Sequence, residues 1–305
     1  VLSKLIDPHL QKDLITAGEV DDVDVQGETV TIRLTLGYPA SSWKSALESL
    51  IRKGIEEITG TREVRVAIET DIVGHEVQKG VNPIPGVRNM IAVASGKGGV
   101  GKSTVSVNLA LGLAVEGAQV GILDADIFGP SQPRMLGISG QPNSPDGKTI
   151  EPHISYNVQA MSIGFLIDEE TPMIWRGPMV TGALEQLLND TKWDDLDYLI
   201  IDLPPGTGDI QLTLVQSISL SGAIIITTPQ DLSLVDVKKG ADMFKKVNVP
   251  IIGVIENMSM FNIEGSIDGI SNYKNINLII NNKKVKFSNN EGEFSISMDI
   301  FKGIG

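Results

Sequence analysis

Residues 92–104 of this 305-residue chain read AVASGKGGVGKST, and this stretch constrains the fold more than any other. Gly96 to Ser103 fits the pattern G-x-x-x-x-G-K-[ST] between an apolar run, MIAVAS, and a helix-like segment, STVSVNLALGLAVEG. Glycines there let successive backbone N–H groups turn inward around phosphate oxygens, and the helix adds the positive end of its dipole. The pattern therefore predicts a strand, a phosphate-binding loop and a helix in succession. The alternative is a glycine-rich turn that binds no phosphate.

The residue types in this loop indicate separate tasks. We expect Lys102 to reach the β- and γ-phosphates of a nucleotide, and Ser103 to ligate Mg²⁺. The residues expected to contact the nucleotide are Gly96, Lys97, Gly98, Gly99, Val100, Gly101, Lys102, Ser103 and Thr104. Because a phosphate-binding loop needs only one lysine, Lys97 requires a further explanation.

Short apolar runs continue from Met90 onward and alternate with helix-like segments. They are MIAVAS, QVGILDAD, YLIIDLPPG, GAIIITTPQ and PIIGVIENM. Continuous β-branched runs are typical of strands buried on both faces, and strands that alternate with helices imply a parallel sheet. We therefore predict a doubly wound α/β domain with a parallel sheet over residues 90–261.

Carboxylates follow two of these runs. Asp124 and Asp126 lie in ILDADIFGPS, where a carboxylate can orient a water, although acidic residues at strand ends often only cap a loop. Asp202 ends an apolar run in LDYLIIDLPPGTGD, as expected of a Walker B carboxylate on the Mg²⁺ side of the site. Pro204 and Gly206 follow it, and we expect both to contact the nucleotide from a backbone that moves with the γ-phosphate.

The segment before this domain has a different pattern. Residues 1–70 alternate apolar and polar side chains on both sides of Gly27 and Glu28, as in a hairpin. Helical spacing follows in SWKSALESLIRKGIEEITG, and REVRVAIE indicates another strand. We predict a small α/β domain here, joined to the larger one by a linker over residues 71–89, which are rich in Gly and Pro.

The last segment, residues 262–305, differs again in composition. It is rich in Asn, Ile and Lys, contains no Ala, and alternates in the manner of antiparallel hairpins. Turns are expected at 281–282 and 289–292. We therefore predict a short β-rich tail that does not continue the preceding pattern.

Composition excludes several classes of function. A net charge of −13 without a basic run argues against a nucleic-acid surface, which needs clustered Lys and Arg. We also expect no membrane span and no secretory signal, and hence a cytoplasmic protein. The chain has no Cys, which removes thiolate ligands, and its three histidines show no metal-ligand spacing.

Taken together, these motifs resemble those of a known family. SGKGGVGKST resembles the deviant Walker A loop of the MinD/ParA/nitrogenase-iron-protein class of P-loop NTPases. With LDADIFGPSQP, WRGPM, DYLIIDLPPGTGDIQLTL, TTPQDLSLVDVKKG and GVIENMSMF, the series is similar to the Mrp/ApbC/Nbp35 family of iron–sulfur cluster carrier ATPases. IDPHLQKDLITAGEVDDVDVQGETV and LGYPASSWKSALES are similar to the small MIP18-type domain that many Mrp proteins carry. The resemblance covers about residues 1–261.

The resemblance implies a slow, dimer-dependent ATPase that uses ATP and Mg²⁺, forms a homodimer and delivers iron–sulfur clusters to client apoproteins. In this class the additional lysine, here Lys97, reaches across the dimer to the partner's nucleotide; otherwise it is a solvated loop lysine. The resemblance also assigns Asp126, with Asp124, to the first switch region. It further implies that Asn257 of ENM contacts the adenine, although an Asn after a buried strand is otherwise a common turn residue.

One departure from the family pattern concerns the cluster. Most members have a Cys-x-x-Cys pair after ENMSxF, but Phe261 is followed here by NIEGSIDG. The tail is a divergent terminus, a foreign segment joined to a truncated carrier by an assembly or fusion event, or an added module. The abrupt change in composition favours the second explanation. The alternatives to cluster delivery are a positioning or regulatory ATPase of the ParA/MinD kind, acting on membrane or DNA, and a non-functional remnant.

Overall fold

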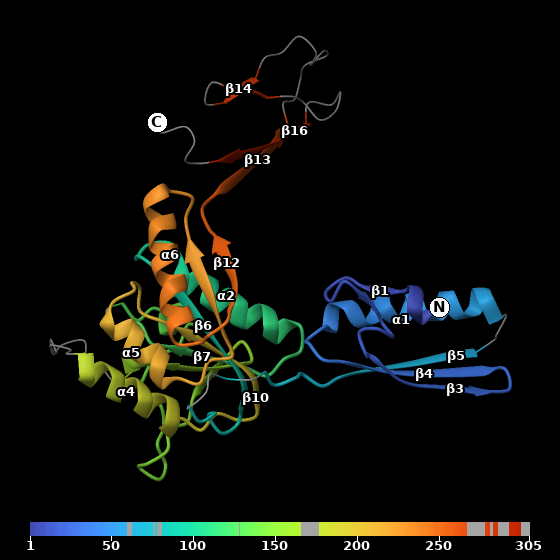
Figure 1. The fold of residues 1–305 in the computed structure, drawn as a ribbon, viewed down its shortest axis with the longest axis horizontal. Coiled ribbons are helices and arrows are strands. Elements are labelled where there is room, and N and C mark those ends of the chain that lie inside the picture. Colours follow the sequence, from blue (N-terminus) through green and yellow to red (C-terminus); the bar gives the residue numbers. More distant parts are fainter. Residues whose placement is uncertain are drawn as a thin grey trace.

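The computed structural model describes residues 1–59, 63–75, 77, 81–127, 129–165, 177–266, 278–280, 283–285 and 293–299. These residues form a small α/β unit at the N-terminus, a larger α/β unit built on a seven-stranded sheet, and paired strands at the C-terminal end (Figure 1).

The small unit is a three-stranded sheet covered by one helix. Its elements are η1 (Leu2–Lys4), β1 (Ile6–Asp7), β2 (Lys12–Asp13), β3 (Val20–Gln26), β4 (Thr29–Leu36), α1 (Ser41–Thr59) and β5 (Glu63–Thr70). The central strand β4 pairs antiparallel with β3 and parallel with β5. Alternate β4 residues, such as Ile32 and Leu34, are buried with Leu47 and Ile51 of α1 because one face of the sheet packs on the helix. The predicted hairpin, helix and strand are confirmed.

The larger unit holds the phosphate-binding loop. Its elements are β6 (Val87–Ser95), α2 (Lys102–Val115), β7 (Val120–Asp124), α3 (Gln132–Met135), β8 (His153–Ser155), β9 (Val158–Ser162), η2 (Ile163–Phe165), α4 (Gly177–Asp190), β10 (Leu196–Asp202), α5 (Asp209–Ser217), β11 (Gly222–Thr227), α6 (Asp231–Lys246) and β12 (Ile251–Glu256). The strand order is β12-β11-β6-β10-β7-β9-β8. Every pairing among these strands is parallel except that of β8 with β9.

The predicted doubly wound α/β fold is confirmed, with one correction to the purely parallel sheet. The edge strand β8 is antiparallel to β9, and a two-residue turn at Tyr156 and Asn157 joins them. Both residues have positive φ, 49° and 61°, which fits the tight turns that match the twist of a hairpin. These strands are short and end the sheet, so they lack the long apolar runs that indicated the central strands.

Helices cover both faces of the sheet. Ala92 and Ala94 of β6 belong to the core beneath α4, α5 and α6, whereas Val93 belongs to the core on the side of α2. Leu199 and Ile201 of β10 face the first core and Ile200 the second, as the two-residue period of a strand requires. This double burial explains why the central strands are uninterrupted apolar runs.

The two units meet at the C-terminal end of α2. The backbone N–H and the hydroxyl of Ser41 both donate to the Glu116 carbonyl oxygen, at 3.1 and 2.9 Å. The Ser42 N–H donates to Oε2 of Glu116 at 2.9 Å. The segment just after α2 therefore supplies acceptors to the first turn of α1.

The C-terminal strands lie outside the seven-stranded sheet, whose edge on this side is β12. They are β13 (Met260–Ser266), β14 (Leu278–Ile280), β15 (Lys283–Val285) and β16 (Glu293–Asp299). β13 pairs antiparallel with β16, and β14 with β15, beyond the end of β12 in Figure 1. Antiparallel strands in the tail are as predicted, and the predicted turns at 281–282 and 289–292 lie outside the described residues. Among the helices that the structure describes, none is both long and apolar enough to span a membrane.

Candidate nucleotide-binding site

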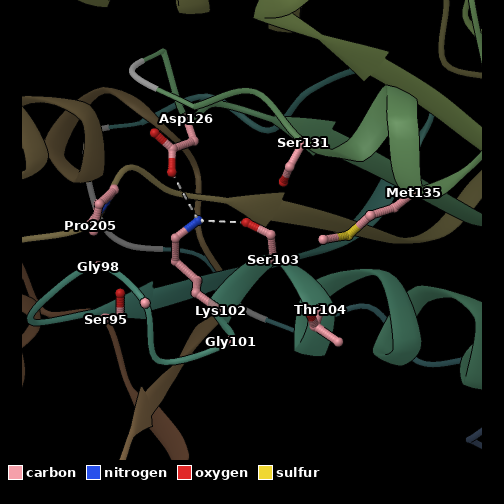
Figure 2. Close-up of a pocket in the computed structure, with 11 residues that line it drawn as sticks. Ser95, Gly98, Gly101, Lys102, Ser103, Thr104, Asp126, Ser131, Met135 and Pro205 are labelled. Carbon is pink, nitrogen blue, oxygen red and sulfur yellow. Dashed lines mark hydrogen bonds and ion pairs between the residues drawn. The ribbon is translucent and has the colours of Figure 1, made fainter.

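A cavity of about 250 Å³ lies where β6 ends and α2 begins (Figure 2). It is lined by Ser95, Gly98, Gly99, Gly101, Lys102, Ser103, Thr104, Asp126, Ser131, Met135 and Pro205. These residues come from the loop between β6 and α2, from the segment after β7 and from the segment after β10. The cavity is therefore at the carboxyl edge of the parallel strands, where ligands bind in open α/β sheets.

Steric requirements explain why glycine occupies several positions of the loop. Gly99 and Gly101 have φ of +79° and +84°, in the left-handed region that side chains other than hydrogen disfavour. A Cβ at Gly96 would collide with Asp236, and one at Gly101 would collide with the side-chain amide of Asn257. The loop thus packs against the segments after β11 and β12 as closely as its backbone permits.

Lys102 is the central cation of the cavity. Its ammonium nitrogen lies 2.6 Å from Oδ1 of Asp202, 3.5 Å from Oδ2 of Asp126 and 3.3 Å from the Ser103 hydroxyl. Figure 2 shows the side chain reaching across the cavity towards Asp126 and Ser103. Lys102 is only 6% exposed, so its charge depends on these carboxylates rather than on water.

Asp202 is fully buried and held from two sides. Besides Lys102, the Ser106 hydroxyl donates to Oδ1 at 2.9 Å. Nε2 of Gln132 donates to Oδ2 at 2.9 Å. Sequence reasoning missed both Ser106 and Gln132. Ser106 lies one helical turn after Lys102, and this spacing could have indicated it.

Asp124 accepts hydrogen bonds from its own loop rather than facing the cavity. Its oxygens accept from the N–H groups of Asp126 (3.1 Å), Ser131 (2.9 Å) and Gln132 (3.0 Å), and from the Ser162 hydroxyl (3.2 Å). Burial, assisted by the charge of Asp202, raises the pKa of Asp124 to about 6 despite these donors. The geometry gives Asp124 the task of shaping the loop that carries Asp126.

The segment after β10 is tied to the phosphate-binding loop. Gly206 has a φ of +109°, and its N–H donates to the Ser95 carbonyl oxygen at 2.8 Å. Pro204 is buried, and its neighbour Pro205 lines the cavity. Pro205 thus lines the cavity and Pro204 does not, while the nucleotide contact of Pro204 stays a prediction.

Two further predicted residues are Lys97, within the loop, and Asn257, which contacts it. The Lys97 carbonyl oxygen accepts from the Ser95 hydroxyl at 2.9 Å, while the ammonium of Lys97 makes no ion pair with any residue that the structure describes. The Asn257 side chain donates to the Val100 carbonyl oxygen at 2.9 Å. Asn257 thus braces the phosphate-binding loop, and its adenine contact stays a prediction.

Comparison with known proteins identifies the family. A family model described as NUBPL iron-transfer P-loop NTPase matches residues 86–289, and one described as Iron-sulfur cluster assembly protein matches residues 1–68. The chain belongs to the NUBPL iron-transfer P-loop NTPase family. The predicted resemblance to iron–sulfur cluster carrier ATPases with an N-terminal MIP18-type domain is confirmed.

Individual relatives agree with this assignment. An iron-sulfur cluster carrier protein of Haemophilus influenzae is 49% identical over 261 residues, covering 85% of this chain and 70% of the relative. The iron-sulfur cluster transfer protein NUBPL of Mus musculus is 53% identical over 181 residues, covering 59% of this chain and 57% of the relative. A nucleotide-binding protein of Archaeoglobus fulgidus, solved in complex with ADP, is 41% identical, with a TM-score of 0.51 over 58% of this chain and 69% of its own.

Proposed function

We propose that this protein binds ATP with Mg²⁺ in the cavity around Lys102, hydrolyses it slowly as a dimer, and serves in the delivery of iron–sulfur clusters to apoproteins. The observation that carries the nucleotide half is the placement of Lys102 and Ser103 at the start of α2 beside Asp202. The delivery half rests on the relatives, which bear the names of iron-sulfur cluster carrier or transfer proteins.

The residues present fit Mg²⁺. The Ser103 hydroxyl and the Asp202 carboxylate are hard oxygen donors, which Mg²⁺ prefers, and both lie beside the Lys102 ammonium in the cavity. Ser103 would bind the ion directly, and Asp202 would hold it from the strand side. When bound, Mg²⁺ neutralises charge on the phosphate oxygens.

The remaining residues divide the work on the nucleotide. Backbone N–H groups of the loop and the N-terminus of α2 bind the phosphates. The Lys102 ammonium, which lies between the carboxylates of Asp126 and Asp202, would exchange them for phosphate oxygens. The exchange is favourable because carboxylates and phosphates are both anions that accept strong hydrogen bonds from an ammonium group. Asp126, which lines the cavity, would orient the attacking water.

Lys97 would act on the nucleotide of a second subunit. A cation placed on the charge that develops at the γ-phosphate accelerates phosphoryl transfer, as an arginine finger does. Supplied by the partner, it makes hydrolysis conditional on dimerisation. Its ammonium is not engaged within the described part of the subunit, which leaves it available for this contact.

The residues of this chain do not fit an iron–sulfur cluster. Such clusters are held chiefly by thiolates, and the sequence contains no Cys. The described residues also contain no group of three or more His, Asp or Glu side chains that could hold a metal ion. In the proposed function the cluster is therefore cargo and not a resident cofactor of this chain.

The nucleotide half is tested with two lysine variants and a matched surface control. Lys102→Ala should abolish ATP binding, whereas Lys97→Ala should leave binding intact and reduce turnover. Lys239→Ala, which removes a 62% exposed side chain from α6, should change neither. Binding is measured by calorimetry and turnover by phosphate release. Equal loss of nucleotide affinity in the two loop variants would contradict the division of labour.

The conclusion that these residues do not fit a cluster is tested by anaerobic reconstitution with iron and sulfide, followed by absorbance and iron quantitation. Without thiolates, the protein alone should retain no stoichiometric cluster, while ATP hydrolysis should persist. A stoichiometric cluster on the isolated protein would overturn the conclusion that its residues do not fit one.

A further inference from the structure

Gln132 joins three segments of the site through one buried side chain. It is the first residue of α3 and is 1% exposed. Its backbone N–H donates to Oδ2 of Asp124 at 3.0 Å. Its Nε2 donates to the Ser103 carbonyl oxygen at 3.0 Å and to Oδ2 of Asp202 at 2.9 Å. The loop after β7, the start of α2 and the end of β10 therefore meet at this residue.

The orientation of the Gln132 amide is forced by its surroundings. Both partners of the side chain, the Ser103 carbonyl and the Asp202 carboxylate, are acceptors, so the NH₂ group must face them. Oε1 then faces away and is buried without a hydrogen-bond partner. The side chain is therefore held in place through its donor group alone.

The contact with Gln132 also fixes the Asp202 carboxylate. Oδ2 is held by Gln132, while Oδ1 receives Lys102 at 2.6 Å. Rotation of the carboxylate would break the Gln132 bond, so Oδ1 stays directed towards the loop lysine. Partners of this kind, one step removed from a metal, orient its ligands and set its affinity.

We propose that Gln132 is a positioning residue for Mg²⁺: its amide NH₂ group holds the Asp202 carboxylate in the orientation that serves the ion. This inference rests on the proposed Mg²⁺-nucleotide site and gives a role to a residue of LDADIFGPSQP whose type alone indicated none. Mg²⁺ demands near-ideal ligand geometry, so the orientation of a carboxylate that holds it matters.

The test compares metal affinity with metal-free nucleotide affinity in the full chain. Gln132→Met keeps the length of the side chain but removes the donor and the acceptor. ADP is titrated in EDTA and in excess Mg²⁺, and Mn²⁺ binding to the ADP complex is followed by electron paramagnetic resonance. We expect ADP affinity in EDTA to stay within about threefold of the wild type, while metal affinity falls about 10- to 100-fold. The Mg²⁺ concentration for half-maximal hydrolysis should rise by a similar factor, with a smaller change in kcat.

Two further variants make the result specific. Gln132→Asn keeps an amide with shorter reach and should lie between the wild type and Gln132→Met in metal affinity. Gln159→Met removes an amide that donates to the Asp194 carbonyl oxygen away from the cavity, and should have no effect. Unchanged metal affinity in Gln132→Met would overturn the proposal. So would a loss of ADP affinity of equal size in EDTA and in Mg²⁺ for both Gln132 variants, since that indicates a role in the fold alone. Absence of Mg²⁺-nucleotide binding in the wild type would instead refute the proposed function.

Discussion

Single side chains balance the charge of the nucleotide site. Lys102 carries one positive charge and lies within 3.5 Å of two carboxylates, those of Asp202 and Asp126. One buried cation between two anions leaves a net negative charge in the site. A divalent cation can neutralise this charge when the lysine binds phosphates instead of the carboxylates. Three separate sequence motifs predicted these three residues. Their pairing depended on strands that lie next to each other in the sheet but far apart in sequence.

A second buried carboxyl group lies in the small unit, and no ion pair joins it to a basic side chain in the part of the chain that the structure describes. It is that of Glu19, which is only 3% exposed. It lies close to Asp7, which accepts a short hydrogen bond from the Tyr38 hydroxyl. Burial, followed by the charge of Asp7, raises the pKa of Glu19 from 4.5 to about 7.

This shift predicts how stability depends on pH. Because the folded state binds the proton of Glu19 more tightly than the unfolded state, the stability of the small unit should fall as pH rises from about 4.5 to 7. Glu19→Gln should remove this fall and raise stability at pH 8 by on the order of 1 kcal/mol. Urea unfolding from pH 4 to 8 measures both effects. Glu28→Gln, an exposed change on the same unit, is the control, and parallel pH profiles for wild type and Glu19→Gln would contradict the prediction.

At the scale of elements, α2 connects the nucleotide site to the small unit. It begins at Lys102 in the cavity and ends at Val115, and the next residue, Glu116, accepts hydrogen bonds from the first turn of α1. The N–H groups of a first helical turn have no partner within their own helix, and a carboxylate there also interacts favourably with the helix dipole. The bond from Ser42 accordingly lowers the pKa of Glu116.

We therefore predict that Glu116→Ala loosens the start of α1. Amide exchange measured by mass spectrometry should become faster in residues 41–45, while exchange at the phosphate-binding loop stays unchanged in the absence of nucleotide. Glu57→Ala, an exposed change near the other end of α1, should leave the exchange of residues 41–45 unaltered. Unchanged exchange in Glu116→Ala would show that the contact does not support the helix.

At the scale of the whole molecule, the small and the larger unit have separate cores. Among the described residues, no side chain belongs both to the core under α1 and to either core of the seven-stranded sheet. Leu34 of β4 lies in the first, and Phe244 of α6 lies in the larger unit; both are at most 1% exposed. Because burial is local, each core should respond to its own substitutions.

Two core variants test this independence. Phe244→Ala should destabilise the larger unit by about 3 to 5 kcal/mol, and Leu34→Ala the small unit by about 2 to 5 kcal/mol. Each should shift only its own transition in scanning calorimetry, with hydrogen exchange assigning the transition to a unit. Val115→Ala, at a side chain 78% exposed, should change stability by less than about 0.5 kcal/mol. A single transition that both core variants shift equally would disprove the separation.

The sequence alone determined the central strands, the phosphate-binding loop and the family, because apolar runs and glycine spacing reflect local backbone requirements. Tertiary structure decided the rest. The short strands β8 and β9 are defined by their pairing rather than by apolar content, and the packing of their loops decides the positions of Asp124 and Pro205. Gln132 became a site residue only because folding brings Asp202, 70 residues away in sequence, to its amide. Such contacts depend on which strands become neighbours, and local sequence carries no record of that choice.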